Sequence, residues 1–579
     1  MPDSSKVNPV AFNCEGGLIL NRSTFLMQPG EALELQNFEP DIGGGYRRIN
    51  GFKKYVNHIV PQTSASSEAI LMSTVFSSKI LAARGEKIWS SASTTVSTAI
   101  ASGTGMTGSG TLTVASTSGF SSSGTLQISS EIFTYTGVTS TTFTGVTRAT
   151  SSTSAADHAV KDIVSESWTV RDTGRTNAAK YSFEKFNFDG NDKIIVVDQT
   201  NAPTVFNTSL SATDVSESSV AGAKHVTAFK GHMFYSGMSS TPEEIVFSQP
   251  FDEDAFSSGS GAGSIKVDDT IVGMKTFRED LFIFCENRIF KLSGTSSANF
   301  AISPVTRNIG CVNGNTIQEF AGDLIFLGPD GLRTVAGTAR IGDVELGTIS
   351  KNVQPLFDEQ IINSSIFESV VIPDKTQYRI LFSKDGQAQT LTKGVICVRK
   401  GESYEFSETR GIKPSCTDTI VDTGDVIVLH GDFSGYINRQ EVGNDFDGTV
   451  IAGKYRSPDL SFNDLGVRKH MQRVIINYKP ESAIDADLFL RYDNESVNSP
   501  RPAAYALDTS KVAAQYGTAT YSTSSSTTQF VYGGGTQPLV RQSVEGSGFT
   551  VALKVDDGGE TAPYSLKGFQ LEYQLGARR

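Results

Sequence analysis

The sequence predicts an all-β protein whose main part is a β-propeller of six to seven irregular blades. Gly is abundant, with 55 residues in 579, and Ser and Thr are frequent, whereas helix-forming blocks are scarce. Short apolar runs alternate with turns that contain Gly, Pro and Asp, which is typical of β-hairpins. The hairpins recur at a loose period in the forties of residues, as expected for four-stranded blades and not for solenoid repeats.

Two hairpins within Asp280–Ser350 show the repeat most clearly. Each has a short apolar strand, a tight polar turn and a returning strand, and the second turn is Gly328-Pro329-Asp330-Gly331. Pro sets φ to about −65° and Gly permits positive φ, so this sequence favours a turn. One hairpin cannot bury its apolar face alone, so we expect further copies. The hairpins begin at Lys79, Asp192, Gly231, Asp280, Asp323, Gln377 and Asp425, and from Asp192 onward they are 39, 49, 43, 54 and 48 residues apart.

Residues 95–165 interrupt this spacing. From Ile88 to Thr147 the one charged residue is Glu131, and Ser, Thr and Gly dominate, a composition that a disordered linker also has. However, stretches such as GTLQISSEIFTYTGV alternate with period two, which favours strands. Without this segment the first interval falls from 113 to about 48 residues. We therefore predict a small β module inserted in a blade loop, and such loops often carry function.

The N-terminal residues 1–60 do not follow the repeat, and we expect an extended docking segment. It contains a predicted strand at Leu18–Leu20 and a predicted short helix at Pro29–Asn37. The glycines at 43–45 indicate a flexible turn, because no Lys-Ser/Thr follows at phosphate-loop spacing. A basic-aromatic cluster follows, which is either a solvated strand face, the favoured interpretation, or a contact to an acidic partner: Tyr46, Arg47, Arg48, Lys53 and Lys54.

The remaining chain divides into a propeller over 61–94 and 166–445 and a C-terminal domain over 446–579. Within the propeller, Ser350–Gln360 is predicted to be an inserted helix with Ser350 as its N-cap. The C-terminal domain is predicted to be an antiparallel β-sandwich, a platform-like domain, because the repeat stops and longer strands follow. In the last of these, Phe569, Leu571, Tyr573 and Leu575 alternate with polar residues.

The sequence contains no clear catalytic, cofactor-binding or metal-binding motif, so we predict no such site and no enzyme. There is no HExxH or GxSxG motif, and only His225 and His232 come near metal-ligand spacing. Asp445–Gly448 resembles part of a calcium loop but lacks the downstream Glu. Other acidic turns, at 252–254 and 268–269, are expected to be solvated. The cysteines show no CxxC pair and are expected to be buried, reduced thiols: Cys14, Cys285, Cys311, Cys397 and Cys416.

Charge and hydropathy limit the partners and the cellular location that we expect for this protein. The formal net charge is −12 without a basic stripe, which argues against a protein that coats DNA. No signal peptide and no apolar run of membrane-spanning length are present, so we expect a reducing cytoplasm and no membrane anchor.

Six segments, in the same order over about two-thirds of the chain, resemble a known family. They are PGEALELQNFEPDIGGGYRRINGF (29–52), VFSQPFDEDAF (246–256), IVGMKTFREDLFIFCENRIFKLSG (271–294), NIGCVNGNTIQEFAGDLIFLGPDGLRTVAG (308–337), GDVELGTISKNVQPLF (342–357) and FQLEYQLGARR (569–579). Together they are similar to the nozzle (tail hub or tail tubular) proteins of short-tailed bacteriophages.

The resemblance implies a structural virion protein, assembled in the host cytoplasm and located in the tail. It implies β-propellers that form a homohexameric ring below the head-to-tail adaptor and enclose the channel through which genomic DNA leaves. Further implied partners are tail fibre or tail-tip proteins, and the 95–165 module, which is outside the resemblance, is a hypothetical docking site for them. A neutral to acidic lumen is expected, so that DNA passes without binding. The alternatives are a carbohydrate-binding or carbohydrate-cleaving propeller on the virion, and a cellular propeller scaffold.

Overall fold

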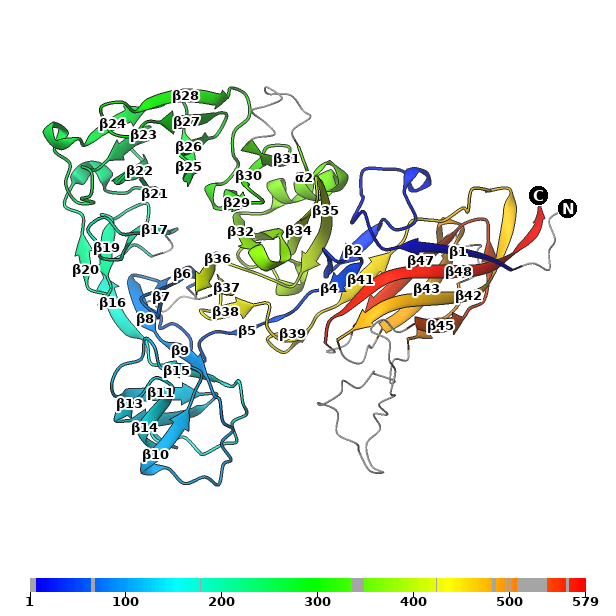
Figure 1. The fold of residues 1–579 in the computed structure, drawn as a ribbon, viewed down its shortest axis with the longest axis horizontal. Helices are drawn as coiled ribbons and strands as arrows, with labels where there is room; N and C mark the ends of the chain where they lie inside the picture. The colour runs from blue at the N-terminus through cyan, green and yellow to red at the C-terminus, as the bar shows by residue number, and fades with distance from the viewer. Residues whose placement is uncertain are drawn as a thin grey trace.

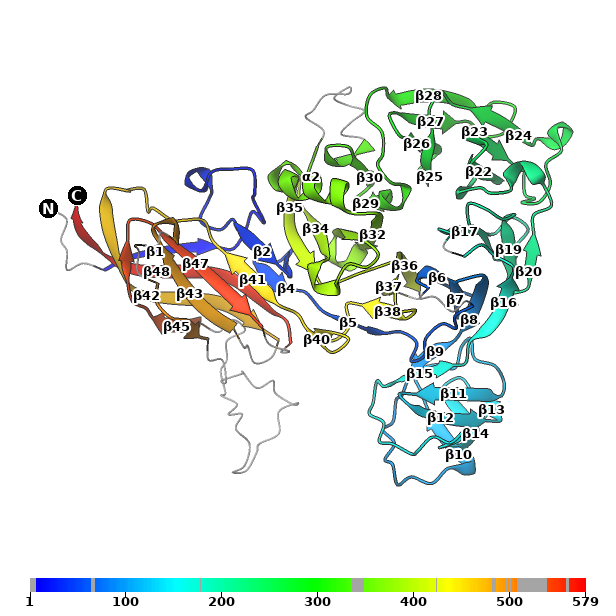
Figure 2. The ribbon, with the colours of Figure 1, turned by 180° about the vertical axis from the view of Figure 1, so that it is seen from behind.

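The computed structural model shows an elongated all-β molecule with a propeller at one end and a β-sandwich at the other (Figure 1). A small module extends from the rim of the propeller, and the view from behind shows the same three parts (Figure 2). The structure describes residues 7–63, 68–177, 179–335, 348–422, 424–481, 486–495, 498, 501–507, 539–558 and 562–578. Within these ranges no helix is long and apolar enough to cross a membrane.

The propeller consists of six four-stranded blades and one three-stranded sheet around a central cavity, which confirms the predicted fold. The blades are, in chain order, β6 (Ile70–Phe76), β7 (Lys79–Arg84), β8 (Lys87–Ser91) and β16 (Thr169–Thr173); β17 (Ser182–Phe186), β18 (Lys193–Val197), β19 (Thr204–Asn207) and β20 (Ala212–Asp214); β21 (His225–Phe229), β22 (His232–Met238), β23 (Thr241–Phe247) and β24 (Gly263–Lys266); β25 (Ile271–Phe277), β26 (Asp280–Cys285), β27 (Ile289–Ser293) and β28 (Ala301–Thr306); β29 (Gln318–Phe320), β30 (Asp323–Gly328) and β31 (Gly331–Thr334); β32 (Ile366–Ile372), β33 (Gln377–Ser383), β34 (Lys393–Lys400) and β35 (Ser403–Arg410); and β36 (Cys416–Asp422), β37 (Asp425–Gly431) and β38 (Ile437–Gln440) with β5 (Phe52–Lys54).

The predicted hairpins are the second and third strands of these blades. The starts at Asp192, Asp280 and Asp323, for example, fall at or beside the first residues of β18, β26 and β30. These strands lie between two neighbours in their sheets and carry the longest fully buried runs, such as Leu281–Cys285. The inner strands that line the cavity are more polar, so hydropathy alone did not identify them as the blade starts.

The N-terminal residues differ from the expected separate docking segment, because they supply strands to both large domains. β5 is the outer strand of the last blade, where Gln440 pairs with Phe52. β1 (Val7–Asn13) pairs along its whole length with β48 (Tyr564–Arg578), and β4 (Tyr46–Arg48) pairs with the start of β48. The expected helix at Pro29–Asn37 is wrong: β2 (Glu34–Gln36) is a strand there, since β35 and β41 (Gly453–Arg456) hydrogen-bond to its two edges.

The sandwich is joined to the propeller by one continuous sheet. This nine-stranded sheet runs from the β32–β35 blade through β2 and β41 into the sandwich. The second sandwich layer contains β1, β48 and their neighbours, and both layers share one hydrophobic core with the β32–β35 blade. The remaining sandwich strands are β3 (Phe38–Pro40), β42 (Val467–Pro480), β43 (Ala486–Tyr492), β44 (Tyr505–Ala506), β45 (Leu539–Ser543), β46 (Ser547–Gly548) and β47 (Val551–Asp557); β39 (Asp445–Phe446) and β40 (Thr449–Val450) form a hairpin beside β5.

The Ser/Thr/Gly-rich insertion folds as a β module between β8 and β16 of the first blade. It has its own apolar core around Phe133, Tyr135 and Phe143. β9 and β15 pair with each other at the base, so the chain leaves and re-enters the blade at one place. Its strands are β9 (Ser93–Thr95), β10 (Thr107–Thr113), β11 (Gly124–Ile128), β12 (Glu131–Tyr135), β13 (Gly137–Val138), β14 (Thr142–Thr147) and β15 (Ile163–Glu166).

The one α-helix among the described residues is α2 (Gln354–Asn363), which lies beside β31. The predicted helix at Ser350–Gln360 therefore exists, and Ser350 stands at the N-cap position of the short 3-10 helix Lys351–Val353 that precedes α2, but its side chain caps neither helix. The N-cap of α2 is Val353, and the Ser350 hydroxyl instead accepts a hydrogen bond from the Leu332 amide at 2.9 Å. The approach of β31 to this loop decided the role of the serine.

Candidate functional site

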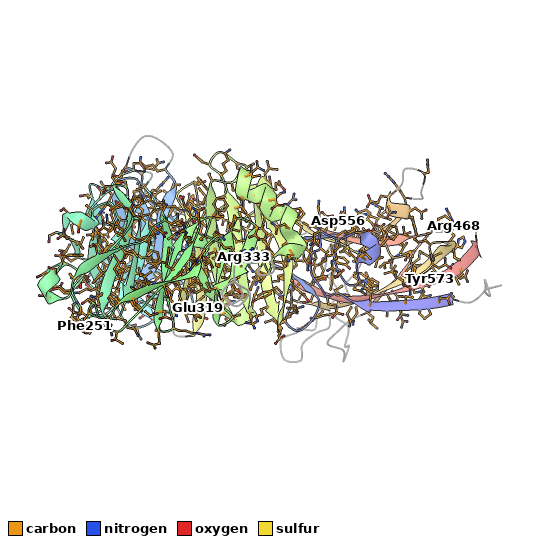
Figure 3. All side chains as sticks on the ribbon, turned by 90° about the horizontal axis from the view of Figure 1, so that it is seen from above. Phe251, Glu319, Arg333, Arg468, Asp556 and Tyr573 are labelled. Atoms are coloured by element: carbon orange, nitrogen blue, oxygen red, sulfur yellow. The ribbon has the colours of Figure 1, made fainter. Side chains whose placement is uncertain are left out.

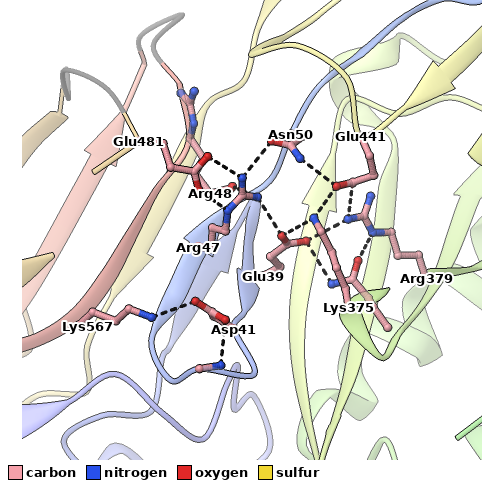
Figure 4. A network of polar contacts seen from close by, with 12 residues as sticks. Glu39, Asp41, Arg47, Arg48, Asn50, Lys375, Arg379, Glu441, Glu481 and Lys567 are labelled. Atoms are coloured by element: carbon pink, nitrogen blue, oxygen red, sulfur yellow. Dashed lines mark hydrogen bonds and ion pairs between the residues drawn. The ribbon is translucent and has the colours of Figure 1, made fainter. Parts of the chain in front are cut away.

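The basic-aromatic cluster lies at the joint between propeller and sandwich (Figure 4). Glu39 of β3 accepts hydrogen bonds from Lys375 Nζ at 2.6 Å and Arg379 Nη2 at 3.0 Å, both of the β32–β35 blade. Arg47 Nη1 approaches the same carboxylate at 3.2 Å. Glu441, which follows the last blade, forms an ion pair with Arg379 at 2.6 Å and accepts a hydrogen bond from Lys375. The network thus ties β3 and β4 to two blades.

The other members of the cluster are paired in the same way. Arg48 Nη1 contacts Asp557 at 3.1 Å with both side chains fully buried, and this pair connects the two sandwich layers. Lys53 Nζ lies 2.6 Å from Asp445. The favoured interpretation of a solvated strand face is therefore wrong, since the acidic groups that meet this cluster belong to the same chain.

The electrostatics of the joint favour ionised groups. Burial acts to raise the pKa of the Glu441 carboxyl, but Arg379 and Lys375 hold this pKa well below its usual range. Burial acts to lower the pKa of Arg47, but Glu481 and Glu39 raise it. Buried ion pairs of this kind cost much stability when one partner is removed. The joint is therefore a rigid structural link that stays charged at neutral pH.

A central cavity of about 430 Å³ lies where the inner strands of the blades converge. Glu368 of β32 accepts hydrogen bonds from Lys180 Nζ at 2.7 Å and from Asn315 Nδ2 at 2.8 Å. The Thr417 amide donates to the other Glu368 oxygen at 3.1 Å. These bonds connect inner positions of different blades and fix them around the axis.

Two further carboxyl groups line this cavity. Burial is the main cause that raises the pKa of both Glu184 and Asp418, although Lys275 and Lys185 act in the opposite direction. Asp418 accepts a hydrogen bond from the Thr74 hydroxyl at 2.7 Å. Burial also lowers the pKa of His225 to about 3, so this imidazole is neutral. The cavity is lined mainly by polar groups. The hydrogen bonds and ion pairs described there join different blades to one another.

The histidines and cysteines that the sequence analysis considered do not come together in a common site. His225 and His232 are four pairs apart in the β21–β22 register, and His232 Nδ1 bonds the Ser248 carbonyl at 2.6 Å. Among the described residues, no three His, Cys, Asp or Glu side chains meet as they would around a metal ion. All five cysteines are buried and free, as predicted, and burial raises the pKa of Cys285, Cys311 and Cys416 to about 12.

The network partners Glu39, Lys375, Arg379 and Glu441 were not identified from the sequence. They are separated by up to 402 positions, from 39 to 441, and none stands in a local motif. The one available signal was the high density of charged residues at 39–54 in an otherwise weakly charged chain.

No family model and no curated protein matches this chain. Similar solved structures include the extracellular domain assigned to a hybrid two-component system of Bacteroides thetaiotaomicron, with 8% identity over 77% of this chain and a TM-score of 0.36. This chain spans 44% of the length of that protein. The WD40 domain of Neurospora crassa Pan2 gives 7% identity, 68% and 96% coverage of the two chains, and a TM-score of 0.34. Kluyveromyces lactis Hsv2 gives 8% identity, 60% and 99% coverage, and a TM-score of 0.27.

Proposed function

We propose that this protein is the structural subunit of a ring-shaped tail nozzle in a short-tailed bacteriophage. Six copies continue the DNA-ejection channel below the head-to-tail adaptor and offer docking surfaces for tail fibre or tip proteins. The protein belongs to the virion tail and catalyses no reaction. Genomic DNA passes through a lumen that is neutral to acidic.

One observation carries the proposal: propeller and sandwich form a single stiff body. A shared nine-stranded sheet and a buried ionic network hold them together. A ring that transmits force during ejection needs subunits that keep their shape, and a closed ring needs faces at fixed angles. A propeller on a flexible tether could not supply such faces.

The positions of the resembling segments support the same proposal. Residues 29–52 form the strands at the joint, and 271–294 form most of one blade. Residues 308–335 form the neighbouring three-stranded sheet, and 569–578 belong to the long strand β48. Residues 246–256 lie at the end of β23 and in the loop after it, and 348–357 lead into α2, whereas 342–347 lie outside the described residues. The described parts of the resembling segments thus lie in the propeller and the sandwich, and none lies in the inserted module.

We also propose that the inserted module is the docking site for a fibre or tip protein. It has an independent core and a single paired entrance, so it can vary without disturbing the blade. Replacing residues 96–162 with a short turn between β9 and β15 should leave rings intact while fibre attachment is lost. Loss of the rings themselves would assign the module to assembly instead.

The test of the nozzle is electron microscopy of the purified protein mixed with virion adaptor complexes. Sixfold rings stacked on the adaptor are the expected result, with adaptor alone as the control. Monomers that leave the adaptor bare would contradict the proposal. Hydrolysis or capture of host glycans by those monomers would favour the carbohydrate-active alternative.

A further inference from the structure

An exposed aromatic side chain stands at the far edge of the propeller. Phe251, in the loop between β23 and β24, is 67% exposed and has φ of +62°. A bulky residue adopts this left-handed conformation at a cost in energy, which the surrounding structure must offset. Two backbone bonds hold the loop: the Phe251 amide donates to the Gly231 carbonyl and the Gln249 amide to the Ala255 carbonyl, each at 2.7 Å. The backbone that carries the exposed ring is therefore held in place.

The surroundings of Phe251 are acidic. Asp252 and Asp254 are both exposed, and Asp254 accepts a hydrogen bond from the Ser216 amide at 2.8 Å. Glu253 between them turns inward, where Lys193 Nζ lies at 2.9 Å. We call Phe251 with Asp252 and Asp254 the acidic knob. Aromatic side chains are enriched in the centres of protein interfaces, which have polar rims.

A hollow of about 530 Å³ lies on the outer face of the sandwich. Small residues create it, because Gly568 of β48 is flanked across the sheet by Asn13 and Asn477, and Ala11 stands in the next row. Ile475 and Leu539, the latter 57% exposed, supply an apolar wall. A Cβ at Gly568 would lie only 2.6 Å from the Phe12 carbonyl oxygen, so a larger residue does not fit at this position without a shift of the backbone.

The rim of this hollow is basic. Arg541 pairs across the strands with Ile475, so both side chains point to the same face, and Arg473 is in the adjacent row. The Arg473 side chain has Glu572 at 3.4 Å, whereas the Arg541 side chain forms no hydrogen bond or ion pair with the described residues. We call this surface the basic hollow. Its basic rim is complementary in charge to the acidic knob, and its apolar wall offers a contact for the Phe251 ring.

Knob and hollow lie on opposite domains of a rigid molecule. Figure 3 shows Phe251 at one end of the long axis and the sandwich at the other. A chain held stiffly at its joint cannot bring its own knob to its own hollow. We infer that the acidic knob of one copy inserts into the basic hollow of a second copy. Such a head-to-tail contact is heterologous, and repetition of it produces a ring or a filament.

This inference deepens the proposed nozzle, because it assigns the contact between neighbouring subunits, and closure into a ring rests on that proposed function. The test is sedimentation velocity of the full-length protein over a concentration series, together with ring formation on adaptor complexes. Phe251→Ala should weaken self-association about tenfold or more, as loss of a central aromatic anchor does. Phe25→Ala removes an aromatic side chain that is 62% exposed elsewhere, and this matched control should leave association unchanged.

Charge reversal gives the sharper comparison. Asp252→Lys with Asp254→Lys makes the knob basic, and Arg473→Glu with Arg541→Glu makes the hollow acidic. Each double variant alone should fail to associate, because its knob and hollow then carry like charge. An equimolar mixture should associate, because each variant's knob then meets an oppositely charged hollow on the other. Unchanged thermal unfolding of all variants would show that each is folded.

The outcomes separate the two proposals. Wild-type rings that persist in the Phe251→Ala and charge-reversed variants would overturn the knob-and-hollow contact and leave the nozzle standing. Wild-type open chains that depend on Phe251 but never close on the adaptor would support the contact and contradict the nozzle. A wild-type protein that neither self-associates nor forms rings would contradict both.

Discussion

Single buried charges show how this weakly charged chain uses its ionisable residues. Glu131, alone in a long stretch of uncharged sequence, is fully buried in the inserted module. It accepts two hydrogen bonds from Arg148 at 2.8 Å, two from backbone amides, and contacts His158 Nε2 at 2.9 Å. Every acceptor position of the carboxylate is used, which is what makes its burial tolerable.

Glu131→Gln should therefore destabilise the module by about 3–5 kcal/mol, because Arg148 is left as an unpaired buried charge. Burial acts to raise the Glu131 pKa, but Arg148, the Ala156 amide and His158 lower it from 4.5 to about 2. A depressed folded-state pKa means that the ionised form stabilises the fold above pH 4.5 and that this is lost as pH falls towards about 2.

Hydrogen exchange of the β11–β14 peptides measures this effect locally. Protection should fall in Glu131→Gln at neutral pH, and the difference from wild type should shrink as the pH falls from 4.5 towards about 2. Asp162→Asn, at a more exposed carboxylate of the same module, is the matched control. An equal loss in both variants, or a difference that does not change with pH, would contradict the assigned role.

At the scale of elements, strands far apart in sequence complete each other's sheets. β5 from the N-terminal segment closes the last blade, so that blade cannot form fully before both regions have been made. Phe52 of β5 is 6% exposed and stacks on Phe446 with ring centroids 5.2 Å apart. The last blade, which packs against the first through β36, β37 and β6, thus depends on a strand from the N-terminal segment.

Phe52→Ala should destabilise the propeller by about 3–5 kcal/mol, the usual cost of removing a buried phenylalanine ring. Urea unfolding measures the change. Leu26→Ala, at a side chain that is 68% exposed in the same N-terminal region, should change stability little. Equal stability of Phe52→Ala and wild type would indicate that the N-terminal segment is only a docking extension.

At the scale of the whole molecule, net charge bears on the proposed passage of DNA through the ring. The chain carries −12, and many of its basic side chains are committed to internal ion pairs. Non-specific binding of duplex DNA requires Lys and Arg that release counterions from phosphates. A passage for DNA functions best when the DNA does not bind to its wall.

We expect assembled rings to leave the mobility of linear duplex DNA unchanged at low salt, where electrostatic binding is strongest. A gel-shift titration at several salt concentrations is the measurement, with a basic DNA-binding protein as the positive control. Retardation that weakens steeply with added salt would reveal a basic lumen and contradict the expected neutral to acidic one.

The sequence by itself determined the class of fold. Turn residues and apolar runs recur at blade spacing, and this local pattern predicted the hairpins at Asp280 and Asp323 as well as the inserted β module. Such features follow from backbone preference and side-chain period, which neighbouring residues specify among themselves. The same applies to the five buried cysteines, since each belongs to an apolar segment or lies beside one.

Only the tertiary structure decided which strands close which sheets and which charges meet. β2 became a strand because two edges from other regions bind it, and Ser350 bonds Leu332 because β31 lies against it. Glu39 and Glu441 converge on Arg379 through a joint that no local pattern encodes. The basic hollow is likewise made of residues from β1, β42, β45 and β48, whose common face arises from long-range pairing, and long-range pairing depends on the packing of the whole chain.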